Sequence, residues 1–314
     1  MYSIEVINLT KKFDLFTAVD NISFNVKEGE IFGFLGANGA GKSTTIRMLC
    51  GILEPTSGDA IIGGCSVVQN PDRVKLNIGY MSQKFSLYND LTVEENIEFF
   101  GGIYGLHGKI LREKKDWVLK ISYLKGSEKL LTGSLPSGIK QRLALGIAVI
   151  HNPKIVFLDE PTSGVDPIYR RNFWELINEL SNEGTTVLVT THYLEEAEYC
   201  NDIILIDSGK IIAQGNPKQL KTNYIENPIF EIESNNTIEA LEILEKQNFV
   251  SEVSIFGNNL HVITNNEFQN VNQINSLLIE KNIIPKRINS IIPTLEDVFI
   301  HLLEKRKENE KVSS

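Results

Sequence analysis

A glycine-rich segment between an apolar run and a helical pattern is the clearest place for chemistry in this sequence. Residues 36–43 read GANGAGKS; they follow IFGFL (31–35) and precede TTIRMLCGIL. Glycines let the backbone wrap around phosphates, a lysine can reach the β- and γ-phosphates, and a serine hydroxyl can bind Mg²⁺. We predict that the phosphates of a nucleotide are held by Gly36, Ala37, Asn38, Gly39, Ala40, Gly41, Lys42, Ser43 and Thr44.

Two carboxylates follow a second apolar run, where the ligand-binding edge of a sheet is expected. KIVFL (154–158) continues into Asp159 and Glu160. Open α/β sheets bind ligands at the carboxyl ends of their strands, and charged residues on an apolar strand are otherwise costly to bury. We predict that Asp159 holds Mg²⁺, directly or through water, and that Glu160 polarises an attacking water as general base. The alternative is that both carboxylates only cap the next turn.

Gln83 and His192 also stand at the ends of strand-like runs. Gln83 follows IGYMS and could ligate Mg²⁺ and sense the γ-phosphate, whereas His192 ends TTVLVTTH and should emerge at the same sheet edge as Glu160. A lone histidine more often has a structural role, but this position favours a part in the reaction. The predicted catalytic residues are Glu160, His192, Gln83 and Lys42, and the predicted metal ligands are Ser43, Gln83 and Asp159.

A turn of Ser, Pro and Gly runs into a basic, amphipathic helix in SLPSGIKQRLALG (134–146). Such a junction directs backbone N–H groups and the positive end of a helix dipole at whatever lies in front of it, which makes a second anion site. Pro136 has neither an N–H nor a hydroxyl group. Proline is tolerated in the first turn of a helix, however, while Gly138 keeps its N–H and Ser137 offers a hydroxyl.

The elements that must position these residues alternate between strands and helices up to about residue 220. Continuous apolar or β-branched runs at 31–35, 154–158, 185–191 and 202–206 are typical of strands buried on both faces of a mostly parallel sheet. Thr92 and Glu95 form a capping-box pattern at the start of a helix. We therefore expect an α/β domain.

After residue 220 the pattern changes to short strands at FEIE, VSEVSIF and LHVIT, with helical patterns around 237–247 and 270–281. Thr294 and Asp297 are placed to cap a last helix. We expect a small α+β domain over 221–305, of ferredoxin-like type, and a charged, frayed tail over 306–314.

Composition limits the classes of function that remain. The chain has 314 residues, a formal net charge of −9 and a pI near 5.2, which argue against a nucleic-acid partner. It has neither a signal-peptide pattern nor an apolar run of the roughly 18–20 residues that a membrane span needs, so we expect a cytoplasmic protein. Cys50, Cys65 and Cys200 have no metal-type spacing and are expected to be reduced thiols.

Taken together, these motifs resemble the nucleotide-binding subunit of an ATP-binding cassette (ABC) transporter. GANGAGKS resembles the Walker A motif, IVFLDE the Walker B motif, Gln83 the Q-loop, LPSGIKQR the signature, PTSGVDP (161–167) the D-loop and His192 the switch histidine. The resemblance covers residues 1–220. It implies a P-loop NTPase cassette with a mostly parallel core sheet, an antiparallel β subdomain and a helical signature subdomain.

The resemblance also implies the ligands and the assembly. ATP and Mg²⁺ would bind with Phe13 stacked on adenine, in a head-to-tail dimer in which Ser137, Gly138 and Asp166 of one chain complete the site of the other. A homodimer is the simpler expectation, and a heterodimer with another cassette is the alternative. A separately encoded, multi-span membrane permease would hold the subunit at the inner face of the cell membrane and carry the substrate path.

Differences from the commonest signature sequence indicate the branch of the family. The commonest signature, LSGGQ, has serine where Pro136 stands and glycine where Ser137 stands, whereas the form LPxGxxQRL and the later PTLEDVF resemble bacterial drug-resistance-type exporters. We therefore expect an active ATPase that drives export. The alternatives are a regulatory cassette weakened by Pro136 and a soluble ABC ATPase without a transport role. Against the latter, Lys42 and Ser137 are only about 95 residues apart, with no coiled-coil insert between them.

Overall fold

The structure is a computed structural model that describes residues 1–83, 87–265, 268 and 270–313. The chain divides into two compact units, Met1–Asn216 and Pro217–Ser314. The division lies a few residues before the end of the predicted cassette at residue 220. In the part of the chain that the structure describes, no helix combines the length and the apolar character needed to cross a bilayer.

The first unit is organised around a six-stranded sheet of order β10-β9-β3-β8-β7-β6. Its strands pair in parallel except β10, which is antiparallel to β9. The strands are β3 (Ile31–Leu35), β6 (Ile78–Met81), β7 (Ile155–Asp159), β8 (Thr186–Thr191), β9 (Asp202–Asp207) and β10 (Lys210–Gly215). The four apolar runs predicted as strands are β3, β7, β8 and β9, and their near-continuous burial is typical of a sheet covered on both faces.

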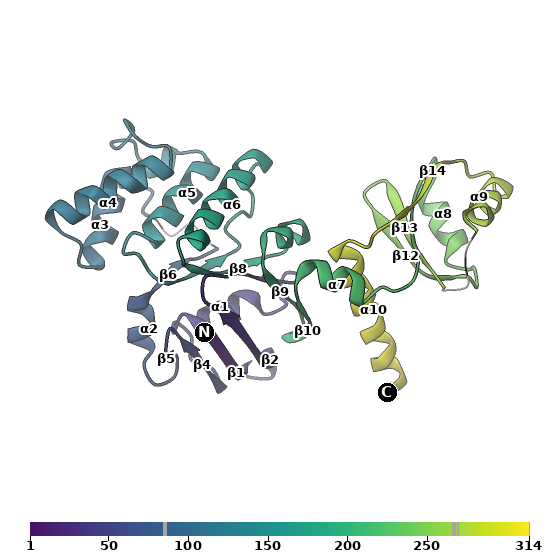
Figure 1. Cartoon of the computed structure of the whole chain (residues 1–314), viewed down its shortest axis with the longest axis horizontal. Coiled ribbons are helices and arrows are strands. Elements are labelled where there is room, and N and C mark those ends of the chain that lie inside the picture. Colours follow the sequence, from purple (N-terminus) through teal and green to yellow (C-terminus); the bar gives the residue numbers. More distant parts are fainter. Residues whose placement is uncertain (84–86, 266–267, 269, 314) are drawn as a thin grey trace. The chain divides into compact units, whose positions relative to one another are not determined.

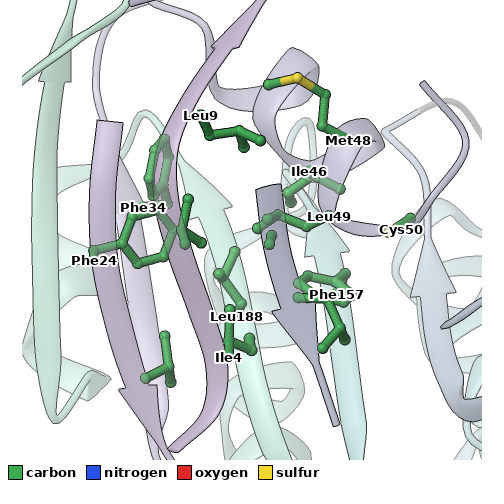
Figure 2. Close-up of a cluster of buried hydrophobic side chains, with 14 of the residues drawn as sticks. Ile4, Leu9, Phe24, Phe34, Ile46, Met48, Leu49, Cys50, Phe157 and Leu188 are labelled. Atoms are coloured by element: carbon green, nitrogen blue, oxygen red, sulfur yellow. The ribbon is translucent and has the colours of Figure 1, made fainter. Parts of the chain in front are cut away.

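A second, antiparallel sheet of order β2-β1-β4-β5 lies beside helix α1 (Lys42–Leu49). Its strands are β1 (Tyr2–Phe13), β2 (Phe16–Lys27), β4 (Ser57–Ile62) and β5 (Cys65–Ser66), and helix α2 (Pro71–Asn77) follows it. One buried cluster joins both sheets through α1, with Ile4 and Phe24 from the antiparallel sheet, Leu49 from α1, and Phe157 and Leu188 from the core sheet (Figure 2). This cluster fixes α1, and with it the glycine-rich loop, on the core sheet.

The remaining helices of the first unit are α3 (Val93–Ile103), α4 (Gly108–Ile121), α5 (Ser137–Ala148) and α6 (Pro167–Asn182), with short 3-10 helices η1 (Thr132–Ser134) and η2 (Leu194–Tyr199). Helices α3, α4 and α5 gather on one side of the core sheet (Figure 1) and form the expected helical subdomain. The predicted capping box of α3 is confirmed, since Thr92 Oγ1 accepts from the Glu95 amide and Glu95 Oε2 accepts from the Thr92 amide.

The second unit consists of α7 (Pro217–Asn223), β11 (Ile229–Ser234), α8 (Thr237–Leu244), β12 (Val250–Phe256), β13 (Asn259–Thr264), α9 (Val271–Glu280), β14 (Pro285–Ile291) and α10 (Leu295–Ser313). From β11 to β14 the order is βαββαβ, and the antiparallel sheet has the order β12-β13-β11-β14. This is the ferredoxin-like topology.

Two features of this unit differ from the sequence prediction. Strand β14 was not predicted, because PKRINSI starts with proline and two charged residues and lies at an edge of the sheet. The backbone of α10 continues to Ser313, where a frayed tail was expected. Its start is the predicted capping pair, with Thr294 Oγ1 accepting from the Asp297 amide and Asp297 Oδ2 from the Thr294 amide.

Candidate active site

The glycine-rich loop joins β3 to α1 in a conformation that only its glycines allow. Gly39 and Gly41 have φ angles of 84° and 109°, in the region that favours glycine. A Cβ atom on Gly41 would lie 2.6 Å from the carbonyl oxygen of Ala18. Ala37 and Asn38 of this loop are exposed, and the loop leads directly into the N-terminus of α1 at Lys42. Such an arrangement is suited to phosphate.

Lys42 is buried at the start of α1 and its ammonium group has three oxygen neighbours. Nζ donates to the carbonyl oxygens of Gly36 (2.8 Å) and Ala37 (3.1 Å) and lies 3.1 Å from Glu160 Oε1. Three donors thus have three acceptors, so the ammonium is held pointing into the loop.

Glu160 is the point on which the predicted catalytic side chains converge. Besides Lys42 at Oε1, its Oε2 accepts from Gln83 Nε2 (3.0 Å) and lies 3.2 Å from His192 Nδ1. The side chain of Glu160 is only 5 % exposed, and its backbone has a φ of 48°, which is unusual for a residue with a side chain. The residues predicted from three separate strand ends are therefore brought together around one carboxylate.

Asp159 lies beside this cluster with one oxygen satisfied and one open. Its Oδ1 accepts from the hydroxyls of Ser43 (2.9 Å) and Thr190 (2.8 Å), whereas Oδ2 is buried and has no hydrogen-bond partner. Burial raises the pKa of Asp159, although the two hydroxyl hydrogen bonds oppose the shift. An ionised carboxylate in this setting lacks a counter-charge at Oδ2.

The oxygen atoms at Asp159 and Ser43 are suited to bind a magnesium ion. A carboxylate oxygen without a partner, next to a serine hydroxyl, is the kind of ligand set that Mg²⁺ uses together with phosphate oxygens and waters. The amide nitrogen of Gln83 donates a hydrogen bond to Glu160, so the amide oxygen is the atom that could reach a metal. Across the described residues, no group of three or more His, Cys, Asp or Glu side chains is placed to hold a metal ion.

Thr190 is a member of the site that the sequence analysis missed. Its hydroxyl donates to Asp159 and accepts from the amide of Glu160 (2.9 Å), so it orders both carboxylate residues. Thr190 pairs with Asp159 in the parallel register of β7 and β8, two residues before His192. Alternation along β8 from His192 could have indicated it.

Pro136 is the N-cap residue of α5, rather than a residue of its first turn as expected, with φ −58° and ψ 149°. The N–H groups of Ser137 and the next residues remain at this end, so Pro136 removes its own N-cap N–H but none from within α5. Gly138 is buried, and a Cβ atom there would lie 2.6 Å from the ring of Tyr169. The glycine is therefore needed for the approach of α6 to α5.

Phe13, Ser137 and Asp166 stand apart from the Glu160 cluster. Phe13 ends β1 with 46 % of its surface exposed, and Lys11 Nζ lies 5.2 Å from its ring centroid. Asp166 is the N-cap of α6, where Oδ1 accepts from the Ile168 amide. No hydrogen bond or ion pair between described residues joins Ser137 or Asp166 to Glu160.

The fold and this site define a P-loop cassette of the ABC type. The family described as "ABC transporter" matches residues 19–163, and the family described as "ATP-binding protein DrrA1-3-like, C-terminal domain" matches residues 215–303.

Related proteins of known name support the same family. The Nod factor export ATP-binding protein I of Rhizobium sp. (strain N33) is 32 % identical over 307 residues, which are 98 % of each chain. The linearmycin resistance ATP-binding protein LnrL of Bacillus subtilis is 40 % identical over 215 residues, 68 % of this chain and 69 % of LnrL. This chain belongs to the ATP-binding proteins of ABC transporters, with a DrrA-like C-terminal domain.

A longer relative matches only in part. The probable multidrug ABC transporter ATP-binding protein YbhF of Escherichia coli is 53 % identical over 218 residues, 69 % of this chain. The aligned part is 38 % of YbhF.

Solved structures agree with the fold of the first unit. The "Structure of ATP binding subunit of ABC transporter" is 28 % identical with a TM-score of 0.65, covering 70 % of this chain and 92 % of that chain. A dimeric cassette, MJ0796 bound to ADP and Pi, is 26 % identical with a TM-score of 0.63, covering 68 % and 98 %.

Proposed function

We propose that two copies of this chain pair head to tail, hydrolyse MgATP at two shared sites, and drive a separately encoded membrane permease of exporter type. The observation that carries the proposal is the convergence of Lys42, Gln83 and His192 on the Glu160 carboxylate. Beside it, Asp159 keeps one oxygen open next to the Ser43 hydroxyl.

In this proposal each side chain has one task. MgATP supplies the phosphoryl group that is transferred to water and the cation that neutralises its charge. Glu160 orients the water and accepts its proton. His192 positions the Glu160 carboxylate and stabilises the negative charge that develops on the phosphate. Gln83 couples the occupancy of the site to the surface where the permease docks. Lys42 must exchange Glu160 for phosphate oxygens, which frees the carboxylate to act as a base.

The second half of each site would come from the other copy. The N–H groups of Ser137 and Gly138 at the start of α5, together with the helix dipole, would offer an anion site to the other copy. Asp166 lies at the start of α6, next to α5 in the helical layer. The dimeric structure of the similar cassette MJ0796 supports the pairing of two copies.

A permease could dock beside Gln83, on the aromatic surface at α3 within residues 84–100. Residues 84–86 of that stretch lie outside the described residues. In the described part, Tyr88 and Phe99 are about half exposed and their rings lie 5.2 Å apart. Asn96 holds the preceding loop through hydrogen bonds with both backbone groups of Tyr88. The relatives include a probable multidrug ABC transporter protein and a Nod factor export protein, which favours export as the direction of transport.

The test is steady-state ATP hydrolysis by wild type, Glu160→Gln and a matched control, Glu195→Gln. Glu195 is exposed and lies three residues after His192, so the control removes a similar charge near the site. We expect Glu160→Gln to lose about 10²–10⁴ in kcat, the usual worth of a general base, and the control to keep the wild-type rate. Equal, slow hydrolysis by wild type and Glu160→Gln would favour the regulatory alternative and overturn the proposal.

A further inference from the structure

A network of four side chains, of which Thr162 and Glu196 are buried, links the turn that follows Glu160 to the ring of His192. Thr162 Oγ1 donates to Glu196 Oε1 (2.5 Å), and Arg170 Nε lies 3.6 Å from the same oxygen. The guanidinium carbon of Arg170 lies 4.0 Å from the ring centroid of Tyr193, and that ring lies 4.1 Å from the His192 ring. The network therefore ends on the histidine that contacts Glu160.

Both ends of the network are fixed to the backbone of the segments they join. Thr162 belongs to the segment 161–167, and Arg170 lies in the first turn of α6, where its amide donates to the carbonyl oxygen of Asp166 (2.8 Å). On the other side, the Glu196 amide donates to the Tyr193 carbonyl oxygen (3.0 Å). A displacement of segment 161–167 must consequently move Arg170 relative to Glu196 and Tyr193.

The network is only partly satisfied in this arrangement. The Glu196 side chain is 2 % exposed and that of Arg170 21 %, and a buried charge is costly unless it is paired. Yet Arg170 Nε and Glu196 Oε2 are both buried without a hydrogen-bond partner. A small movement of the start of α6 toward η2 would shorten this 3.6 Å contact to a hydrogen bond and give the buried Nε of Arg170 a partner.

We propose that Arg170 is a positioning residue that sets the His192 ring according to the position of segment 161–167. The inference rests on the proposed function, in which a second copy contacts Asp166 at the end of this segment. Glu196 holds the guanidinium in place and Tyr193 passes its position to the histidine. Arrival of the second copy thus adjusts His192 at Glu160, so that hydrolysis follows pairing.

The closing experiment compares Arg170→Lys with Arg171→Lys. Lysine keeps the positive charge beside Glu196 but loses the flat guanidinium that stacks on Tyr193. Arg171 is the matched control, since it lies on the same helix and pairs with Glu175 at the surface. The first measurement is the ring resonances of the five histidines in ¹³C-histidine-labelled protein without nucleotide. We expect Arg170→Lys to shift the His192 resonance alone and Arg171→Lys to shift none.

The second measurement is hydrolysis in two backgrounds. We expect Arg170→Lys to lower kcat about tenfold with KM for ATP within about twofold, and to have no further effect when His192 is already alanine. An unmoved His192 resonance, or an equal loss of kcat in the His192→Ala background, would overturn the proposal. Failure of the proposed function is distinguishable, because it appears as a wild type without turnover, while the resonances still report whether Arg170 positions His192.

Discussion

Histidine–carboxylate pairs occur in both units of this protein, in opposite settings. In the first unit, His192 lies 3.2 Å from Glu160, and its side chain is 29 % exposed. In the second unit, His261 of β13 lies 2.8 Å from Asp297 of α10, with exposures of 8 % and 2 %. His301 of α10 pairs with Glu252 of β12 at 2.9 Å, so two pairs fasten one helix to one sheet.

The difference between the pairs shows how the same chemistry can serve reaction or structure. Glu160 also contacts Lys42 and Gln83, and in the proposed function these contacts are exchanged for a nucleotide and a water. Asp297 is instead committed to the capping of its own helix and to His261. An open, exchangeable pair is suited to catalysis, and a closed pair to holding α10 in place.

The largest expected effect is on catalysis. His192→Ala should lower kcat for ATP hydrolysis by about 10², at the lower end of the range for a group that assists proton transfer, with little change in the melting temperature. His107→Ala is the control, since His107 is exposed and its side chain makes no capping hydrogen bond. Steady-state kinetics and calorimetry check this pair, and a hydrolysis rate that survives in His192→Ala would remove the distinction between the two settings.

Disruption of the His261–Asp297 pair should lower the stability of the protein instead of its activity. His261→Ala leaves Asp297 buried without its partner, which costs about 2–3 kcal/mol, or roughly 10 °C in the melting temperature of a domain of about 100 residues. The kcat of folded protein should stay unchanged. Differential scanning calorimetry measures the effect, and an unchanged transition would show that α10 does not depend on this pair.

Replacement of Asp159 should have a smaller effect on stability than that of His261, and it should stabilise the protein at neutral pH. Because burial raises its pKa in the folded state, the group favours folding only when protonated, at acidic pH, and this contribution is lost as the pH rises through the folded pKa. At neutral pH the charged carboxylate therefore opposes folding. Asp159→Asn should raise the melting temperature at pH 7, with less gain as the pH is lowered, and should weaken magnesium-dependent ATP binding. Melting curves from pH 4 to pH 8 test the sign, and a lower melting temperature at pH 7 would contradict it.

The smallest effect is expected at Pro136. Replacement by serine restores the common signature residue, but Pro136 removes no N–H group from within α5. We expect kcat to change by less than about threefold, while a serine cap contributes about 0.5–1 kcal/mol to the helix. A tenfold rise in kcat for Pro136→Ser would show that the proline weakens the site.

Much of the site could be predicted from the sequence because parallel strands end at one edge. The residues that follow β3, β7 and β8 lie at that edge whatever the rest of the chain does, which is why Lys42, Glu160 and His192 meet. Strong local signals, such as the capping pair of Thr294 and Asp297, were equally readable.

The rest depends on contacts that no local pattern encodes. The network of Thr162, Arg170 and Glu196 joins three segments whose approach is set by the packing of α6 against the sheet. The length of α10 was missed because its charged residues favour a helix as readily as a tail. Strand β14 is recognised only by its pairing with β11.

The central claim, that two copies share their sites, is tested most directly by the solution mass of Glu160→Gln with and without MgATP. Glu160→Gln removes the general base, so the paired chains should keep their ATP and stay together. The account predicts one chain of 35.3 kDa without nucleotide and twice that mass with it. The double variant Glu160→Gln/Ser137→Arg, which places a bulky side chain at the exposed start of α5, should remain at one chain. A Glu160→Gln protein that binds MgATP and stays at 35.3 kDa would contradict the shared site.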